Sequence, residues 1–275
     1  MTEQLEVSLE GAQETLLVPL YGRATMTRQG SDLIDDPKAV EMVEAIDYDF
    51  TRFDGSMSLV GSVLRTRIFD HWVTRWLAAN PTGTVVEVGA GLNTRFERID
   101  NGTARWVELD LPDVVGLRRR FFTDTDRRTL LAASVTDPTW HDAVAATGGP
   151  WFFAAEAVLI YLQEAEVAAT LAAIGRRFPA ARVALDTWTT WMRDHQDEHD
   201  AISQLDADFT WFCDDLGDLD LGDVGLTVLD SCTFVDAPPE LIDLLPPALR
   251  EMLPALADDP QMRSYRQNLV HLDTP

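Results

Sequence analysis

Short apolar runs alternate with helical patterns along the second two-thirds of the chain. β-branched and aromatic runs that predict strands are followed by segments such as 164–178, where apolar residues recur at helical spacing. Strands separated by helices indicate βαβ units and a mostly parallel sheet. The predicted strands are 84–89, 104–110, 128–134, one within 151–162, 181–188, 225–232 and 268–273, with a helix over 113–122 after the second strand.

Two regions fall outside this alternation. Residues 1–80 precede the first strand and have helical patterns, clearest over 39–46 and 63–79. Residues 188–224 form an aromatic and acidic insertion between the fifth and sixth strands. Binding sites of open α/β sheets lie at the carboxyl ends of the strands. We therefore expect 1–80 to be a helical lid and substrate segment, and 81–275 to be the main domain, whose insertion faces the substrate.

Charge and composition narrow the class of protein. The formal net charge is -24, from 46 acidic and 22 basic residues, which disfavours binding to nucleic acids and to anionic membrane surfaces. No apolar run approaches the length of a membrane span, and the acidic N-terminus lacks the features of a signal peptide. Cys213 and Cys232 are too few for a disulfide framework. We expect a soluble, cytoplasmic protein.

The sequence VVEVGAGLNT, residues 85–94, predicts a strand that ends in a glycine loop. Gly89 and Gly91 allow a ligand to approach the backbone, but Thr94 stands where a dinucleotide fingerprint has its third glycine. Asp110 follows Gly89 by 21 residues at the end of the next strand, where an acid can bind ribose hydroxyls. The pair indicates a nucleoside site without a pyrophosphate, as S-adenosylmethionine requires; a purely structural loop is the alternative.

Longer stretches carry a family resemblance. Residues 15–24, 35–50, 64–70, 85–100, 106–122, 132–140 and 155–162 follow one another in the order of the family, and 209–215 matches more loosely. Together they resemble the leucine carboxyl methyltransferase family, in particular its bacterial branch of tetracenomycin-type polyketide O-methyltransferases. The resemblance implies an α/β class I methyltransferase fold, in which a seven-stranded, mostly parallel sheet with an antiparallel last strand has helices on both faces. It also implies S-adenosyl-L-methionine as the methyl donor.

The resemblance also implies roles for single residues. Arg65 matches the arginine that holds the methionine carboxylate, Asp110 the acid on the ribose, and Ser134 with Val135 the segment that reads the adenine edge. Glu156 lies in an apolar stretch, where a carboxylate is costly unless a cation pairs with it. The expected cofactor-binding set is Arg65, Glu87, Gly89, Ala90, Gly91, Asn93, Asp110, Leu111, Ser134, Val135 and Glu156, and the expected catalytic residues are Tyr161 and Glu156.

Asn93 departs from the resembling family, which usually has Asp at this position. Asn keeps the size and the turn-forming hydrogen bonds but removes one negative charge. If the acid mainly fixes the loop geometry, the change is tolerated. If it balances Arg95 or the cationic end of the donor, affinity for the donor falls and Asn93→Asp should restore it.

The acceptor is open between two kinds of oxygen. A carboxylate is already ionised at neutral pH, whereas a phenol, with an ordinary pKa of about 10, benefits from a general base. Arg23 and Arg28 can clamp an anionic acceptor, or can pair with the nearby Asp32, Asp35 or Asp36. The aromatic residues of the insertion, Phe212 among them, can stack on a flat acceptor or form the insertion's own core. The expected substrate-binding set is Tyr21, Arg23, Arg28, Tyr161, Trp188, Trp191 and Trp211.

No pair of histidines has convincing metal-ligand spacing. His195 and His199 lie four residues apart, but the residues between them lack the order of a zinc-binding helix. We interpret this stretch as a solvated acidic helix and expect no metal.

The sequence thus predicts an O-methyltransferase that uses S-adenosylmethionine and acts on the carboxylate or phenol of a small, polyketide-type molecule, as a monomer or homodimer. The alternatives are a methyltransferase of protein C-terminal carboxyl groups, or a protein that binds the cofactor but serves as a cyclase or non-catalytic partner.

Overall fold

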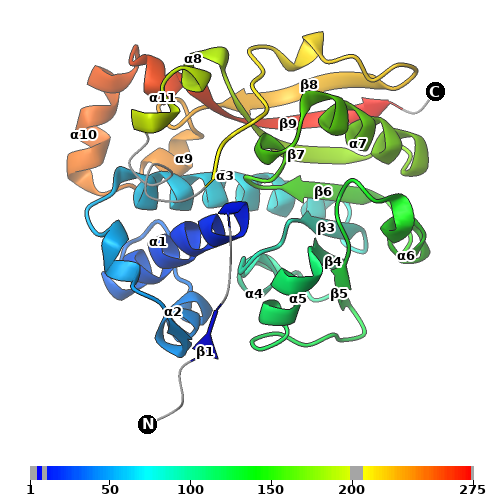
Figure 1. Ribbon diagram of the computed structural model, residues 1–275, viewed down its shortest axis with the longest axis horizontal. Coiled ribbons are helices and arrows are strands. Elements are labelled where there is room, and N and C mark those ends of the chain that lie inside the picture. Colours follow the sequence, from blue (N-terminus) through cyan, green and yellow to red (C-terminus); the bar gives the residue numbers. More distant parts are fainter. Residues whose placement is uncertain (1–4, 8–10, 199–206, 274–275) are drawn as a thin grey trace.

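A seven-stranded sheet forms the centre of the computed structural model, which describes residues 5–7, 11–198 and 207–273 (Figure 1). The strands of this sheet are β3 (Thr84–Val88), β4 (Arg105–Asp110), β5 (Arg128–Ala132), β6 (Trp151–Ala155), β7 (Arg182–Trp188), β8 (Gly225–Cys232) and β9 (Tyr265–Asp273). Their order is β5-β4-β3-β6-β7-β9-β8. Strands β3 to β7 are parallel, and β9 lies antiparallel between β7 and β8. The predicted strands and the reversal of the last one are confirmed.

The centre and the edge of the sheet differ in burial. All five residues of β3 are buried, because a central parallel strand is covered on both faces. At the edge of the sheet, β8 is largely exposed, including Val228 and Leu229. The glycine loop that follows β3 therefore starts from a fully buried strand at the centre of the sheet.

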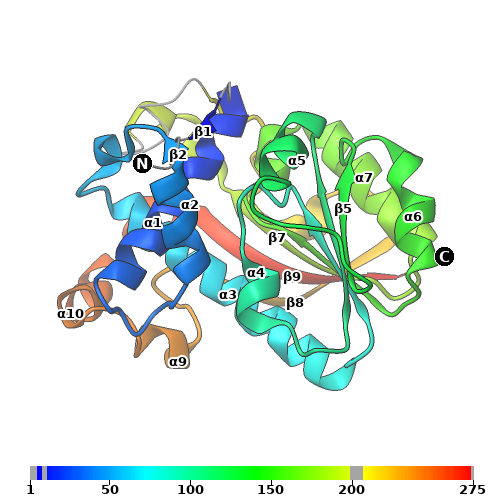
Figure 2. The ribbon, with the colours of Figure 1, turned by 90° about the horizontal axis from the view of Figure 1, so that it is seen from below.

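Helices cover both faces of the sheet. The helices next to the strands are α3 (Met57–Ala79), α4 (Arg95–Ile99), α5 (Pro112–Arg118), α6 (His141–Ala146) and α7 (Glu164–Arg177). Apolar residues of α6 and α7 pack on one face, and those of α3 and α4 pack on the other. Figure 2 shows α3 on the side of the sheet away from α6 and α7.

The N-terminal segment is helical, as expected. It contains the 3-10 helices η1 (Gly11–Leu16) and η2 (Phe50–Phe53), the helices α1 (Leu17–Arg28) and α2 (Pro37–Ala45), and a small parallel pair of β1 (Leu5–Glu6) with β2 (Ile46–Asp47) that the sequence analysis did not predict. Asp36 caps α2 by accepting a hydrogen bond from the Ala39 N–H. Residues of α1 and α2 share a core with Leu92 and Val115. This core fastens the N-terminal helices to the glycine loop.

The insertion between β7 and β8 has little regular structure where it is described. It contains α8 (Thr190–Arg193), η5 (Gln196–Glu198) and η7 (Leu216–Asp218). Residues 199–206 lie outside the described residues, and with them His199 and its spacing from His195. After β8 the chain forms α9 (Pro239–Ile242), α10 (Pro247–Leu256) and α11 (Pro260–Ser264), which the sequence analysis did not predict. No helix among the described residues has the length and apolar character to span a membrane.

Candidate active site

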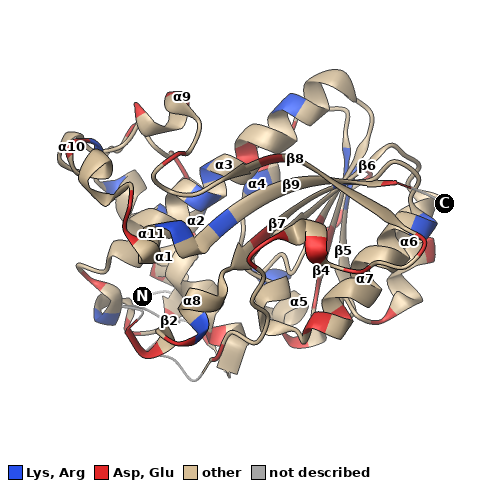
Figure 3. Cartoon of the chain, turned by 90° about the horizontal axis from the view of Figure 1, so that it is seen from above, with Lys and Arg blue, Asp and Glu red and all other residues tan. Residues whose placement is uncertain are grey.

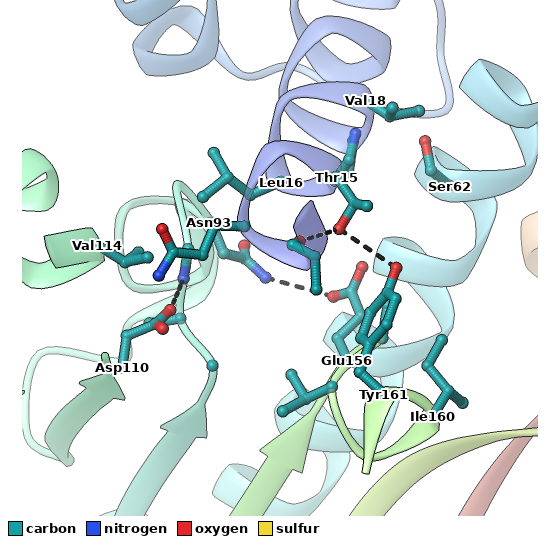
Figure 4. A pocket seen from close by; sticks show the side chains of 18 of the residues that line it. Thr15, Leu16, Val18, Ser62, Asn93, Asp110, Val114, Glu156, Ile160 and Tyr161 are labelled. Atoms are coloured by element: carbon teal, nitrogen blue, oxygen red, sulfur yellow. Dashed lines mark hydrogen bonds between the residues drawn. The ribbon is translucent and has the colours of Figure 1, made fainter. Parts of the chain in front are cut away.

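A cavity of about 330 Å³ lies where β3, β4, β5 and β6 end. This is the edge at which open α/β sheets bind their ligands, and the volume is at the lower end of the range for small-molecule sites. Residues of η1, α1 and α3 form the opposite walls, so the N-terminal segment covers the strand ends. Figure 4 shows side chains from both sides pointing into the same space.

The glycine loop after β3 has a left-handed backbone. Gly89 has φ of 62° and Gly91 has φ of 46°, a conformation that side chains rarely adopt. A Cβ at Gly89 would lie 2.3 Å from Cγ2 of Val158, and one at Gly91 would lie 3.4 Å from Cβ of Leu16. We expected both glycines to make room for a ligand. At Gly89, however, the space for a side chain is filled by Val158 of the chain itself.

Asp110, at the end of β4, holds the glycine loop. Its Oδ2 accepts a hydrogen bond from the Gly91 N–H at 2.6 Å (Figure 4). Its Oδ1 accepts one from the Leu111 N–H at 2.7 Å. Burial raises the pKa of Asp110, and these two backbone N–H groups oppose the rise. Asp110 and Leu111 line the cavity together with Ser134 and Val135, which follow β5. The structure thus brings the expected ribose and adenine residues to one wall.

Glu156, just after β6, is a nearly buried carboxylate inside the cavity wall. It accepts hydrogen bonds from Arg65 Nε at 2.9 Å, Arg95 Nη2 at 2.5 Å and Thr66 Oγ1 at 2.7 Å. The Asn93 amide donates to it at 3.3 Å (Figure 4). Burial would raise the pKa of Glu156, but the two arginines outweigh burial and lower it to about 2. Glu156 therefore stays ionised, and its partners are the cations that its sequence context predicted.

A buried charge network lies beneath the glycine loop. Arg95, whose side chain is fully buried, also pairs with Asp70 at 2.8 Å and with Glu87 at 2.6 Å. Arg98 pairs with Asp70 at 2.9 Å. Figure 3 shows basic residues on α3 and α4, where this network lies. Glu87 was expected to contact the cofactor, but it binds Arg95 and does not line the cavity.

Arg23 connects the N-terminal helices to the glycine loop. Its Nε pairs with Asp36 at 2.9 Å, and its Nη2 donates to the Leu92 carbonyl at 2.7 Å. Thr94 also donates to Asp36, at 2.5 Å. Arg23 lines the cavity, is buried, and is held by these two contacts. The sequence left open whether Arg23 clamps an anionic acceptor or pairs with a nearby acid. The structure shows the pairing with Asp36.

Five aromatic side chains form the wall of the cavity farthest from Asp110 along the sheet. The ring centroids of Trp188 and Tyr265 lie 4.1 Å apart in a stacked pair, and those of Trp188 and Phe209 lie 5.2 Å apart. Tyr161 packs against Phe209, and Phe234 packs edge-on against Tyr265, each at 5.5 Å. All five line the cavity. We call Tyr161, Trp188, Phe209, Phe234 and Tyr265 the aromatic wall.

Tyr21 and Arg28 lie outside the cavity lining, although both were expected to bind the acceptor. The Tyr21 hydroxyl donates to Asp54 at 2.6 Å, and Arg28 pairs with Glu44 at 3.1 Å on the surface. Both side chains lie on α1, on sides of the helix that do not face the cavity. Their placement gives no support to an acceptor-binding role.

Two tryptophans of the insertion also lie outside the lining. Trp191 stacks on His195 with ring centroids 3.8 Å apart. Trp211 is buried in the main core, and Phe212 packs on the outside of the aromatic wall. For these residues the structure favours the reading in which the insertion builds its own core, whereas Trp188 lines the cavity.

Several lining residues were not predicted. Phe209 lies in the stretch FTWFCDD, from which Trp211 and Phe212 were named as candidates and Phe209 was not. Phe234 and Tyr265 lie in segments that carried no recognised motif. The strand signal of β9 was read from 268 onward, but the strand begins at Tyr265. A strand extended by three residues would have placed Tyr265 beside Trp188, with which it is in register.

Comparisons with known proteins agree with this geometry. The family model described as Leucine carboxyl methyltransferase matches residues 17–175. The chain is 31% identical over 234 residues to the tetracenomycin polyketide synthesis O-methyltransferase TcmP of Streptomyces glaucescens, covering 84% of this chain and 86% of that protein. It is 26% identical to the S-adenosyl-L-methionine-dependent methyltransferase dpfgK of Gibberella zeae, over 80% of this chain and 82% of that one.

A solved structure supports the fold. A putative methyltransferase from Thermobifida fusca superposes with a TM-score of 0.58 at 15% sequence identity, covering 93% of this chain and 96% of that chain. The family model spans more than half of the chain, and the order of strands is that of a class I methyltransferase. The chain therefore belongs to the leucine carboxyl methyltransferase family.

Proposed function

We propose that this methyltransferase transfers a methyl group from S-adenosylmethionine to an oxygen, a carboxylate or a phenol, of a small polyketide-type acceptor. The observation that carries the proposal is one cavity that joins the acid at the end of β4 to the aromatic wall. The similarity to a relative named for polyketide synthesis supports the kind of acceptor.

The residues at the strand ends fit S-adenosylmethionine. The donor has an adenine, a ribose and a zwitterionic amino acid end, and it carries no pyrophosphate. The cavity offers apolar side chains at Leu111 and Val135 for the base and Asp110 for the ribose hydroxyls. Arg65 and Glu156 place opposite charges together for the carboxylate and the ammonium. When bound, S-adenosylmethionine supplies an electrophilic methyl group on a sulfonium sulfur.

The chain itself aligns the two reactants and shields them from water. Tyr161 donates a hydrogen bond to Thr15 Oγ1 at 3.2 Å, which ties η1 over the cavity (Figure 4). Burial raises the pKa of Tyr161, so it stays protonated and acts as a hydrogen-bond donor. A covered, mostly apolar site excludes water and holds the two reactants in line. We propose that the aromatic wall orients the acceptor oxygen toward the methyl group.

Isotope transfer tests this function. The protein is incubated with S-adenosylmethionine labelled in the methyl group, together with small aromatic acids and phenols and, separately, with a peptide that ends in a free carboxylate. We expect label on a small molecule, released by base if it is an ester. Label on the peptide alone would identify a protein carboxyl methyltransferase. Donor binding without label on any acceptor would identify a cofactor-binding protein without transferase activity.

A further inference from the structure

Gly61 is the point at which helix α3 meets the aromatic wall. It lies in the second turn of α3, and in the interior of a helix glycine is less favourable than alanine. A Cβ at this position would lie 3.0 Å from Cε2 and 3.4 Å from Cζ of Phe234. Gly61 and Phe234 both line the cavity. Glycine therefore allows the ring of Phe234 to lie against the backbone of the helix.

Phe234 is the last ring of the aromatic wall. The rings follow one another in the order Tyr161, Phe209, Trp188, Tyr265 and Phe234, and the successive distances between ring centroids are 5.5, 5.2, 4.1 and 5.5 Å. The row offers more aromatic surface than one small ring can cover. Because Phe234 contacts α3 at Gly61, it closes the row against the helix.

The part of α3 that faces this end of the cavity carries small residues. Ser58, Gly61 and Ser62 line the cavity, and the Ser62 hydroxyl donates a hydrogen bond to the Leu59 carbonyl of the same helix at 2.9 Å. A flat aromatic molecule placed here would stack on the rings and lie against these small residues. The position of Phe234 therefore decides how much of the row such a molecule can reach.

The ring of Phe234 has one direction in which it can be displaced. The preceding backbone is fixed, because Thr233 donates to Asp236 Oδ1 both from its N–H and, at 2.7 Å, from its Oγ1. The ring packs against the core cluster that contains the apolar residues of α3, and its edge meets Tyr265. A packed core has little free volume. A side chain at position 61 would therefore push the ring into the cavity.

We propose, on the basis of the proposed function, that Gly61 and Phe234 together determine how wide an aromatic acceptor the cavity accepts. With glycine at position 61, Phe234 lies back against α3, and the row of rings has room for a fused pair of aromatic rings. With a larger residue there, Phe234 occupies that room and a single ring fits. The pair acts on the width of the acceptor and leaves the donor unaffected, because Asp110 lines the opposite part of the cavity.

Two acceptors that differ by one ring test this pair. Salicylate and 3-hydroxy-2-naphthoate each carry a carboxylate beside a phenol, so the comparison does not depend on which oxygen takes the methyl group. Their Kd values are measured by calorimetry with S-adenosylhomocysteine bound in place of the donor, which prevents transfer. We expect the wild type to bind the naphthoate about tenfold more tightly than salicylate, because the second ring buries more apolar surface.

Gly61→Ala should remove this preference. We expect it to weaken binding of the naphthoate by about tenfold and binding of salicylate by less than about twofold. The variant should fold, because alanine favours a helix more than glycine does. Gly116→Ala is the matched control, since Gly116 is also a helical glycine, in α5, but a Cβ there would meet open space and it lies outside the cavity lining. It should change neither Kd.

Phe234→Leu shows whether the effect passes through the contact between the two residues. Leucine is shorter than phenylalanine, so in the Phe234→Leu background Gly61→Ala should change the affinity for the naphthoate by less than about twofold. A loss of about tenfold in that background too would show that the two residues act independently and would overturn the inference.

Equal losses for both acceptors in Gly61→Ala, no loss for the naphthoate, or binding of neither acceptor by the wild type would also overturn the inference. Calorimetry with S-adenosylmethionine separates the two proposals. Absence of donor binding by the wild type contradicts the proposed function itself. Donor binding that is intact in the wild type but lost in Gly61→Ala contradicts the assignment of Gly61 to the acceptor alone.

Discussion

Two buried acids, Glu156 and Asp186, stand at neighbouring strands of the sheet and differ in charge. Glu156 lines the cavity and Asp186 does not, yet the larger contrast is in charge: the pKa of Glu156 falls to about 2 and that of Asp186 rises to about 7. Glu156 has two arginines at hydrogen-bond distance. Asp186 accepts from a backbone N–H and faces the Gln267 amide at 3.5 Å, and no cation of the described residues lies at hydrogen-bond distance from it. Burial is shared, so the number of cations in contact decides which acid holds a proton.

The two ends of the cavity also differ in the number of charged groups around them. The end that we propose for the donor is built from strand ends and from a buried charge network in which Arg95 pairs with three acids. The end that we propose for the acceptor is built from aromatic rings packed on one another. A buried charge network fixes one geometry for a cofactor of fixed structure, whereas an aromatic surface binds flat molecules with less constraint.

The largest effect is expected from breaking the network at Arg95. Arg95→Ala leaves Asp70, Glu87 and Glu156 without their shared cation in the interior. Removing one partner of a buried pair costs about 3–5 kcal/mol, measured as the free energy of unfolding in urea. Arg176→Ala is the control, because its pair with Asp223 is exposed, and an exposed pair contributes about 0–1 kcal/mol. Equal losses in the two variants would contradict the importance of the network.

A second prediction concerns stability and pH at Asp186. The pKa of Asp186 is about 7 in the folded protein, above its ordinary value of 3.8, so ionisation of Asp186 lowers the free energy of unfolding. This loss is absent at a pH below 3.8, grows as the pH rises, and is complete just above a pH of about 7. Asp186→Asn removes this cost. The stability of the variant relative to wild type should therefore rise by about 2–3 kcal/mol between a pH of about 5 and about 8, measured by urea unfolding.

Glu156→Gln should show the opposite dependence of stability on pH. The pKa of Glu156 falls from 4.5 to about 2 on folding, so its charge stabilises the fold above the ordinary value and this contribution is lost as the pH falls toward 2. The deficit of Glu156→Gln should be constant near neutral pH and shrink in acid. If the difference in free energy of unfolding between Asp186→Asn and wild type does not change with pH, ionisation of Asp186 does not destabilise the fold.

A third prediction separates the two ends of the cavity kinetically. Phe209→Leu removes a ring that stacks on Trp188 and packs on Tyr161. The KM for an aromatic acceptor should rise by about tenfold, while calorimetry should show an unchanged Kd for the donor. Phe178→Leu is a control, because Phe178 is also buried but does not line the cavity. If donor affinity falls along with acceptor affinity, the two ends are not independent.

The smallest effect is expected at Asn93. Its amide donates to Glu156 at 3.3 Å, and its Oδ1 accepts from Arg98 at 3.3 Å. In Asn93→Asp the gain of an ion pair with Arg98 opposes the loss of the bond to Glu156, so donor affinity should change by less than about threefold. Calorimetry decides between the two readings of this position, since tightening by about tenfold or more would support the reading in which the missing charge matters.

Much of the donor end could be predicted from the sequence because its residues are local. Gly89 and Gly91 directly follow a strongly patterned strand, and Asp110 ends the next one, so the parallel sheet brings them together. Glu156 could be recognised because a carboxylate in an apolar run requires a partner. The sequence could not identify the partners, because Arg65 and Arg95 come from two helices that lie far from Glu156 in the chain.

The acceptor end was predicted less well because its parts meet only through the fold. Trp188, Phe209, Phe234 and Tyr265 come from β7, the insertion, the segment after β8 and the start of β9. Trp211 was predicted to bind the acceptor and Phe209 was not. In the structure Trp211 is buried in the main core, whereas Phe209 lines the cavity. Which aromatic side chain faces a cavity depends on tertiary packing that has no signature in a local pattern.

Donor binding by wild type and Asp110→Ala, measured by isothermal titration calorimetry with S-adenosylmethionine, tests the account most directly. Asp110 lines the cavity and also holds the Gly91 N–H, so its loss should weaken binding by about 10- to 100-fold. Asp113→Ala is the control, because this acid lies in the first turn of α5 outside the lining. Tight binding by wild type and Asp113→Ala with weak binding by Asp110→Ala is the predicted result. Absence of binding by the wild type, or undiminished binding by Asp110→Ala, would contradict it.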